Sequence, residues 1–534
     1  MLNISVPEEL LEQLLPHRQR LVDLKVASRI AAKDFTIWGK EAEAESSIRL
    51  GWVGSATDSQ KLVSEILQLK QELNSKGITR IVLCGMGGSS LAPEVITKTY
   101  GVELEVLDST NPDHVRKVVY KDLEKTAVVV SSKSGSTVET DSQKRIFEEA
   151  FSRAGIDKAE RIFIVTDPQS PMEQAARADG YRVFNADPTV GGRYSALTAF
   201  GLVPSGLAGV NVQDLLDDAL AAGEILGVDE TNNEAVILGA AMARSASRNG
   251  FRDKLGLISD ADTLPDFADW AEQLIAESTG KHDKGVLPVV LSESSPEVQL
   301  ELDDMVLVAV SESEAFSSQA PILVSGSIGE QFLLWEYATA IASALLEINP
   351  FDQPDVESAK VAARGMLQQK GQAVAVEFTE DGIGVNYSGF TSADIKTVLA
   401  SLDKFLAEAG ENSYIAIQAY LDRLEGIALE DLREAIVSAI SRPVTVGWGP
   451  RFLHSTGQYH KGGPKTGIYL QLITKAQEDV AVPGRDFSFG ELIASQSAGD
   501  AKVLSDLGRP VLTLTLSDPV EDVKKLTRML MERK

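Results

Sequence analysis

The sequence predicts an α/β protein built on parallel β-sheets. Apolar runs rich in valine and isoleucine alternate with longer stretches of helical periodicity, and in the first third of the chain they lie at residues 79–84, 102–108, 127–131 and 161–167. Strands separated by helices require crossover connections, which place helices on both faces of a parallel sheet. Ligands bind beyond the carboxyl ends of the strands in such sheets, so the loops after these runs are the expected place for a site.

The alternation of strand and helix patterns divides the chain into several units. Its 534 residues favour about three domains. The predicted division is a polar helical segment over 1–50, a first sheet domain over 51–225, a second over 226–365, an inserted smaller α/β region over 366–444, and a C-terminal α/β segment over 445–534 that completes the second domain.

Composition narrows the set of partners. The net charge of −27 argues against nucleic acid and anionic membrane surfaces. No run reaches the ~18 apolar residues of a membrane span, and the first residues lack the basic and apolar parts of a secretory signal. The single cysteine, Cys84, excludes a disulfide framework, so a cytoplasmic protein is expected. The sequence offers no histidine or cysteine cluster for a metal, so no cofactor is expected.

A hydroxyl-rich run at residues 131–140 follows one of the predicted strands and precedes a helical pattern. Six of its ten residues are serine or threonine, and one is Lys133. Hydroxyls, free backbone N–H groups and a cation at a helix start suit a phosphate monoester. Ser136 and Glu139 match a capping box, which would place the helix start at Ser136. A polar strand-to-helix turn with an ordinary cap explains the run equally well.

A glycine-rich turn at residues 85–90 follows the first predicted strand. Glycine lets the backbone approach a ligand closely, which invites a dinucleotide interpretation. The turn lacks the third glycine of G-x-G-x-x-G, because Ser90 and Leu91 follow Ser89. A small phosphosugar or a plain turn is therefore favoured over a dinucleotide.

Three side chains could carry proton-transfer chemistry. Arg193 follows a double glycine and could stabilise a developing oxyanion, because arginine stays charged. Glu277 lies in the last turn of a helix that ends at Gly280, where a carboxylate either faces solvent or is tuned as a base, with Lys281 as its expected i, i+4 partner. His454 lies among small and polar residues, as a cleft histidine would. A surface arginine, a solvated glutamate and a structural histidine remain the alternatives.

Together these stretches resemble the phosphoglucose isomerase family, whose core is two sugar-isomerase (SIS) domains. The resemblance covers about residues 50–365 and 445–475 and is most specific at the Val-Glu-x-x-Lys segment that ends at Lys360. It is similar above all to the isomerase part of fused transaldolase–phosphoglucose isomerase proteins. The matching stretches are residues 85–89, 132–140, 191–195, 277–281 and 349–360.

The resemblance implies reversible isomerisation of glucose 6-phosphate and fructose 6-phosphate through a cis-enediolate, a reaction of glycolysis and gluconeogenesis. It implies two SIS-type doubly wound domains and no cofactor. Glu277 would move the proton between C1 and C2, Arg193 would stabilise the enediolate, and Lys360 and His454 would assist ring opening. The implied contacts to the phosphosugar are Gly88, Ser89, Ser132, Lys133, Ser134, Thr137, Gln273 and Gln353.

The histidine departs from the family's order. In most members it lies between the glutamate and lysine motifs and comes from the partner subunit, whereas His454 follows Lys360 here. Action in its own subunit and action across a homodimer both stay open.

Two alternative functions stay open as well: a non-catalytic SIS regulator that binds a sugar phosphate, and a dual phosphoglucose/phosphomannose isomerase. The isomerase half of an amidotransferase is disfavoured, because that enzyme needs an N-terminal cysteine domain and the only cysteine is Cys84.

Overall fold

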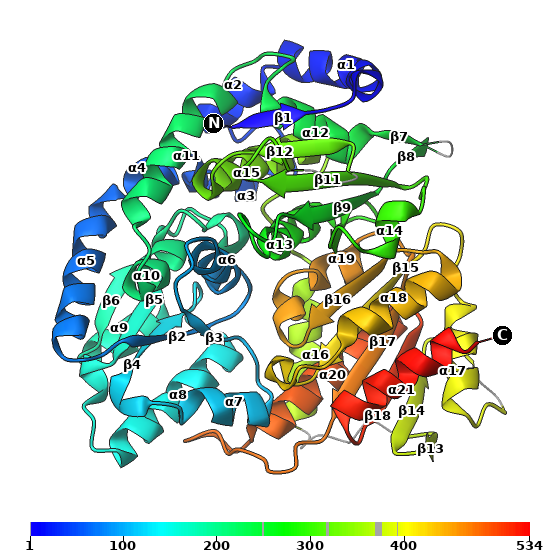
Figure 1. Ribbon diagram of the computed structural model, residues 1–534. Coiled ribbons are helices and arrows are strands. Elements are labelled where there is room, and N and C mark those ends of the chain that lie inside the picture. Colours follow the sequence, from blue (N-terminus) through cyan, green and yellow to red (C-terminus); the bar gives the residue numbers. More distant parts are fainter. Residues whose placement is uncertain (1, 248–249, 317–319, 369–375, 392–393, 534) are drawn as a thin grey trace.

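The first domain is built on a parallel sheet with the strand order β3-β2-β4-β5-β6. The computed structural model describes residues 2–247, 250–316, 320–368, 376–391 and 394–533 (Figure 1). All neighbouring strands of this sheet are parallel, which confirms the fold class expected from the alternating pattern. The strands are β2 (Arg80–Gly85), β3 (Glu105–Leu107), β4 (Thr126–Ser131), β5 (Ile162–Thr166) and β6 (Arg182–Asn185).

Alternate residues of β2 point to opposite faces of this sheet. Ile81 and Leu83 join one apolar core together with residues of α5 (Gln60–Ser75) and α10 (Ala199–Ala208). Val82 and Cys84 join a second core with α7 (Pro112–Val119) and α8 (Val138–Arg153). The strand is buried on both faces, which explains its continuous apolar sequence.

The second domain has the strand order β1-β12-β11-β9-β10. Strands β9 (Lys254–Ser259), β10 (Leu287–Leu291), β11 (Met305–Ser311) and β12 (Ile322–Ser325) are parallel. Strand β1 (Asn3–Ser5) adds to the edge, antiparallel to β12. The predicted helical segment over 1–50 therefore begins with a strand, and helices α1 (Glu8–Asp23), α2 (Val26–Ala31) and α3 (Glu43–Ser46) follow it.

The chain beyond residue 376 forms a third domain around one sheet. Its order is β13-β14-β18-β17-β15-β16, with β13 (Phe378–Glu380), β14 (Ile383–Ser388), β15 (Tyr414–Tyr420), β16 (Val444–Trp448), β17 (Gly467–Thr474) and β18 (Val511–Leu516). The prediction that residues 445–534 complete the second domain is wrong. Strand β17 pairs with β15 along its length, so the C-terminal segment and the predicted insert share one sheet.

The third domain also has its own apolar core. Side chains of three helices pack on this sheet and form the core together with its strands. These helices are α17 (Val398–Leu406), α18 (Leu429–Ile440) and α21 (Pro519–Met531). The sequence pattern of this region also predicts helices over 393–409 and 429–440. Helix α18 matches the second of these. Helix α17 begins later than the first, and residue 393 lies outside the described residues.

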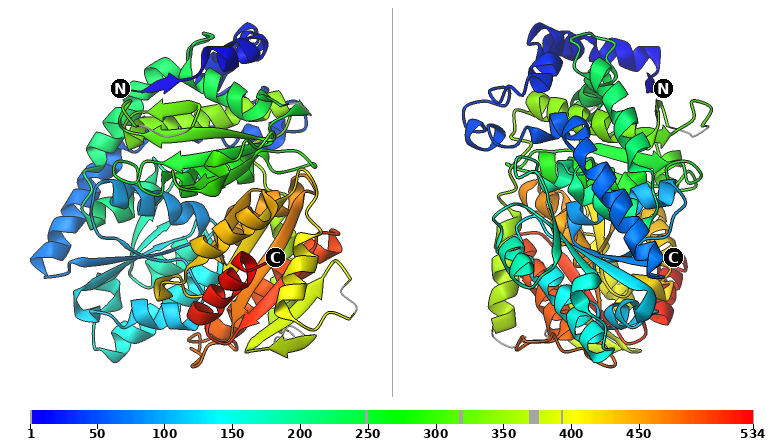
Figure 2. Two further views of the ribbon diagram at one scale, coloured as in Figure 1. Left: turned by 45° about the vertical axis from the view of Figure 1, so that its right-hand side comes forward. Right: turned by 90° about the vertical axis from the view of Figure 1, so that its left-hand side faces the viewer.

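Helix α13 (Phe267–Thr279) lies where the three domains meet (Figure 1). It contacts β10 of its own domain, α6 (Leu91–Thr99) of the first domain and α19 (Gly457–Gly462) of the third. The N-terminus lies on the second domain and the C-terminus on the third (Figure 2). Within the described residues, no helix has the length and apolar character needed to cross a membrane.

Candidate active site

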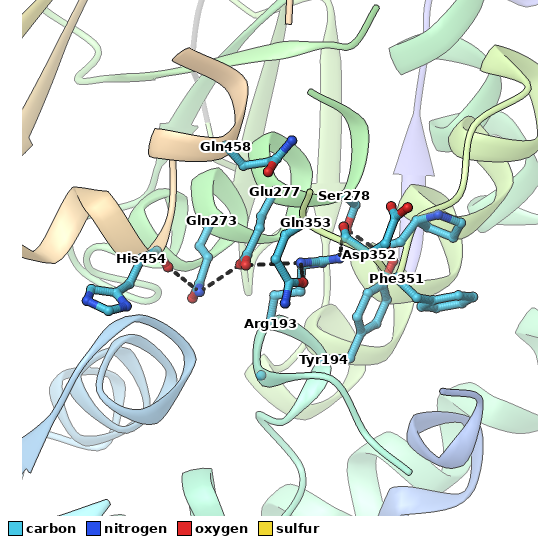
Figure 3. Close-up of polar contacts among 12 residues, drawn as sticks. Arg193, Tyr194, Gln273, Glu277, Ser278, Phe351, Asp352, Gln353, His454 and Gln458 are labelled. Carbon is cyan, nitrogen blue, oxygen red and sulfur yellow. Dashed lines mark hydrogen bonds and ion pairs between the residues drawn. The ribbon is translucent and has the colours of Figure 1, made fainter. Parts of the chain in front are cut away.

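Two polar residues of α13 face the junction between the domains. Glu277 lies in the last turn of the helix, and Gln273 lies one turn earlier. The Gln273 amide Nε2 donates to Glu277 Oε2 at 3.1 Å and to the His454 carbonyl oxygen at 2.8 Å. Gln273 therefore connects the carboxylate of the second domain to the histidine segment of the third (Figure 3).

Arg193 completes this group from the first domain. It lies in the 3-10 turn η5 (Gly192–Tyr194), its side chain is 4% exposed, and Nη1 lies 3.1 Å from Glu277 Oε1. Nη1 also donates to Gln353 Oε1 at 3.0 Å, and Nη2 donates to the carbonyls of Pro350 and Asp352 at 2.8 and 3.0 Å. A permanently charged guanidinium is thus fixed beside the carboxylate, in a position to stabilise negative charge on a bound oxygen.

Two glycines of the predicted turn at residues 85–90 allow this close approach. A Cβ on Gly88 would lie 2.1 Å from the Gly192 carbonyl oxygen, and one on Gly87 would lie 2.5 Å from the His454 carbonyl oxygen. Gly87 also has a φ of +54°, a conformation that glycine adopts at little cost. The turn that ends at Ser89 therefore packs directly against the Arg193 and His454 segments.

Lys281 does not pair with Glu277 as expected. Its Nζ lies 2.7 Å from Asp352 Oδ1 and donates to the carbonyls of Asn349 and Asp352 at 2.7 and 2.6 Å. Burial, together with the charge of Arg193, lowers the pKa of Lys281 to about 8. The expected ion pair of Lys281 with Glu277 does not form, because the turn at residues 349–353 offers three acceptors to the buried ammonium. These contacts of Lys281 fix the turn that contains Gln353.

The His454 imidazole points away from Glu277 and toward the first domain (Figure 3). His454 ends the 3-10 turn η7 (Arg451–His454), and its Nε2 lies 3.1 Å from Glu139 Oε1. The same carboxylate oxygen accepts a hydrogen bond from Gln496 Nε2 at 2.7 Å. Glu139 can therefore orient the imidazole.

The predicted capping box at Ser136 is wrong. Thr137 is the N-cap of α8 and makes no side-chain cap, and Ser136 instead lies beside Ser134 with Oγ atoms 3.0 Å apart. Glu139 is buried, and its carboxylate lies against His454 of another domain. The local motif could not reveal this role, because the partners of Glu139 in the site come from the third domain.

A cavity of about 270 Å³ adjoins the hydroxyl-rich loop. Ser134, Ser136 and Thr137 line it at the start of α8, together with His454 and with Arg364 of α16 (Val356–Gln368). Helix N-termini attract anions through their free N–H groups and the helix dipole. Hydroxyls, a helix start and a guanidinium here meet the needs of a phosphate group.

Two expected phosphate contacts lie beside the cavity and do not line it. Lys133 Nζ lies 2.6 Å from Asp167 Oδ2, and burial lowers the pKa of Lys133. Ser132 Oγ donates to Thr137 Oγ1 at 3.2 Å and supports the loop from within. Sequence reasoning assigned the cation of this loop to Lys133 and missed Arg364, whose only signal was its position one turn after Lys360.

Five of the predicted site residues contact one another, and the side chain of one further predicted residue, Lys360, is not described. Arg193, Gln273, Glu277, Gln353 and His454 form one continuous set of contacts. Lys360 belongs to α16, but its side chain lies outside the described part of the chain. His460, the other histidine of the segment, is buried among aromatic rings, and burial keeps its pKa well below the usual value, so it has a structural role. Among the described residues, no group of three or more histidine, cysteine, aspartate or glutamate side chains could hold a metal.

Comparison with known proteins agrees with this geometry. The family model described as phosphoglucose isomerase matches residues 57–295. Over these residues the chain is similar to the phosphoglucose isomerase family. The match covers the first domain and the part of the second that contains Glu277, and it ends before the third domain.

Relatives of the family share part of the chain. It is 28% identical over 338 residues to a probable glucose-6-phosphate isomerase of Natronomonas pharaonis, which covers 54% of this chain and 78% of that protein. It is 28% identical over 363 residues to the glucose-6-phosphate isomerase of Geobacter sulfurreducens, with 57% and 68% covered. The solved structure of a hypothetical protein from Thermus thermophilus is 25% identical with a TM-score of 0.58 and covers 69% of this chain and 100% of its own.

Proposed function

We propose that this protein interconverts glucose 6-phosphate and fructose 6-phosphate by moving one proton between C1 and C2 through a cis-enediolate. The observation that carries the proposal is the contact of the Glu277 carboxylate with the Arg193 guanidinium at 3.1 Å. Moving a proton between adjacent carbons requires a base within reach of both carbons and a positive charge beside the oxygen that becomes negative. Glu277 supplies the first requirement and Arg193 the second.

The hexose phosphate would bind with its phosphate at the start of α8. Ser134 and Thr137 would donate hydrogen bonds there, and Arg364 would supply positive charge. The cavity lies in a chain of net charge −27, so this local reversal of charge is required to attract a dianion. Gln353, held by Arg193, and the turn with Gly88 and Ser89 would contact the sugar.

His454 would open the sugar ring by donating a proton to the ring oxygen as the bond between this oxygen and C1 breaks, and the C1 hydroxyl proton would pass to solvent water. Glu139 Oε1, 3.1 Å from His454 Nε2, would hold the imidazole in place. His454 lines the phosphate cavity with its side chain and reaches Glu277 through Gln273 with its backbone. We therefore propose that His454 acts within its own chain. Once the ring of glucose 6-phosphate is open, Glu277 would take the proton from C2 to form the enediolate. A proton would then move from the C2 hydroxyl to the C1 oxygen, and Glu277 would return its proton to C1.

A coupled assay that detects glucose 6-phosphate formed from fructose 6-phosphate tests the activity. A subunit-mixing experiment tests the action of His454 in its own chain. Glu277→Gln and His454→Asn variants, each with a strongly reduced turnover alone, should gain no turnover when mixed after subunit exchange. Recovery of a fraction of wild-type turnover in the mixture would show that the two residues meet across subunits.

A non-catalytic sugar-phosphate sensor is disfavoured by the same contacts. A sensor needs the loop at the start of α8, but it has no use for a buried arginine fixed beside a carboxylate in the last turn of a helix. A carboxylate is disfavoured at a helix C-terminus, so its retention there with a paired arginine favours a catalytic role.

A further inference from the structure

A buried ion-pair network joins the first domain to the segment that carries His454. Glu94 lies in the first turn of α6, and its side chain is 9% exposed. Its Oε2 accepts from Arg451 Nη1 and its Oε1 accepts from Arg423 Nη1, both at 2.9 Å. Asp108 adds a second carboxylate, 3.2 Å from Arg451 Nη1 and 3.5 Å from Arg423 Nη2.

The network borders a polar cavity of about 260 Å³ on the side of α13 that carries Asp269 and Glu272. Although burial opposes it, the charges of Arg451 and Arg423 hold the pKa of Glu94 below its usual value. Glu94 is therefore ionised at neutral pH, and the two arginines are held by charge-assisted hydrogen bonds, which are stronger than neutral ones.

Arg451 and His454 are the two ends of the same 3-10 turn, η7. Glu94 and Asp108 fix the side chain at one end, and Gln273 fixes the backbone carbonyl at the other at 2.8 Å. Phe452 between them is 2% exposed and packs on Tyr420, with ring centroids 5.5 Å apart. With both ends held, the direction of the His454 imidazole toward Glu139 is determined by contacts to another domain.

We propose that the Glu94–Arg451 ion pair positions His454 for proton transfer, although neither residue touches the substrate. The proposal rests on the proposed function, because it assumes that His454 acts in its own chain. Its physical basis is that a displacement of about 1 Å in a reacting group can cost ~100-fold in rate. Loss of the pair would leave Arg451 held by Asp108, loosen the Arg451 end of η7 and let the imidazole move.

The test replaces Glu94 with glutamine, which keeps the size of the side chain and removes its charge. Turnover, kcat, should fall about tenfold to 100-fold, and KM should change less than threefold, because the phosphate loop is untouched. Arg451→Lys keeps the positive charge but loses the planar set of N–H donors of the guanidinium, so kcat should fall by a smaller factor. This variant serves as the test if Glu94→Gln does not fold.

Glu297→Gln is the matched control. Glu297 of α14 (Pro296–Gln299) binds Arg433 of α18 at 2.8 Å and is likewise a buried Glu–Arg pair between the third domain and another domain. It lies outside the candidate active site, so its loss should leave kcat within about twofold of the wild type under conditions in which the variant stays folded.

A double-mutant cycle separates positioning from a general structural effect. If Glu94 acts through His454, then Glu94→Gln should not lower kcat further in a His454→Asn background. Multiplicative losses in the double variant, or an equal loss of kcat in Glu297→Gln, would overturn the positioning role and leave the proposed function standing. Wild-type turnover of His454→Asn alone would instead refute the role of the histidine in the proposed function.

Discussion

Replacement of Glu277 by glutamine gives the sharpest test of the proposed chemistry. The amide keeps the shape of the side chain and can still accept a hydrogen bond from Arg193, but it cannot take a proton. Arg193 also keeps its three contacts to Gln353, Pro350 and Asp352, so the site should remain assembled. The change therefore removes the base and leaves the architecture of the site in place.

The expected loss follows from the role of a positioned base. General-base catalysis contributes about 10²–10⁴-fold, which corresponds to roughly 3–5 kcal/mol of activation free energy at ~1.4 kcal/mol per tenfold change. We expect kcat to fall by about 10³-fold with little change in KM, because in the proposed mechanism Glu277 acts on the reacting carbons and not on the phosphate. The cost in stability should match that of Glu297→Gln, which also removes a carboxylate from beside a buried arginine.

Two measurements check this prediction. The coupled assay gives kcat and KM, and incubation in deuterated water followed by NMR gives the exchange of the C2 hydrogen with solvent. Both turnover and exchange should be lost together. A variant that keeps more than a tenth of wild-type kcat and still exchanges the C2 hydrogen would refute the assignment of Glu277 as the base.

Three further changes probe other parts of the molecule. Arg364→Ala should raise KM for either sugar phosphate about tenfold with a smaller effect on kcat, whereas Arg364→Lys should recover part of the affinity; steady-state kinetics at low and high salt measure both. Glu297→Gln should lower the free energy of unfolding by about 3–5 kcal/mol in urea titrations, because buried Arg433 then keeps only the exposed carboxylate of Glu430 as an ion-pair partner, and a loss under ~1 kcal/mol would contradict this. Burial raises the pKa of Asp269 from 3.8 to about 6, so its ionisation destabilises the folded state as pH rises through this range. Asp269→Asn should therefore be more stable than the wild type at pH 7, by up to about 3 kcal/mol, and the difference should vanish toward pH 4.

The sequence predicted four strands of the first domain, β2 to β5, because most of their residues are apolar and buried, but it did not predict β6, β9 or β12. Runs such as Val128–Val130 are apolar at every position, because their side chains enter the apolar cores on both faces of the sheet. It could not show which sheet a later strand would join, because strand pairing is decided by contacts distant in the sequence. Strand β17 thus belonged to the third sheet, although its own residues, Gly467–Thr474, were recognisable as a strand.

The candidate site shows the same division between local and distant information. Residues that motifs mark directly, such as Arg193 and Glu277, meet in the structure at 3.1 Å. Glu139 was noticed only as a possible cap, because its partners His454 and Gln496 lie more than 300 residues away. The sequence suggested that the positive charge of Lys133 is available to a phosphate. The structure shows that Lys133 is paired with Asp167 instead, a contact that the local motif could not reveal.

Strand β1 has a consequence for the order in which the protein is made. Residues 3–5 leave the ribosome well before their partner strand, β12, which ends at residue 325. At ~5–20 residues per second, β1 waits roughly 15–60 s for its partner, long enough for the whole first domain to emerge and fold. The chain therefore closes the second sheet around an already folded neighbour, and an amino-terminal tag or deletion should slow this late step more than it alters the first domain.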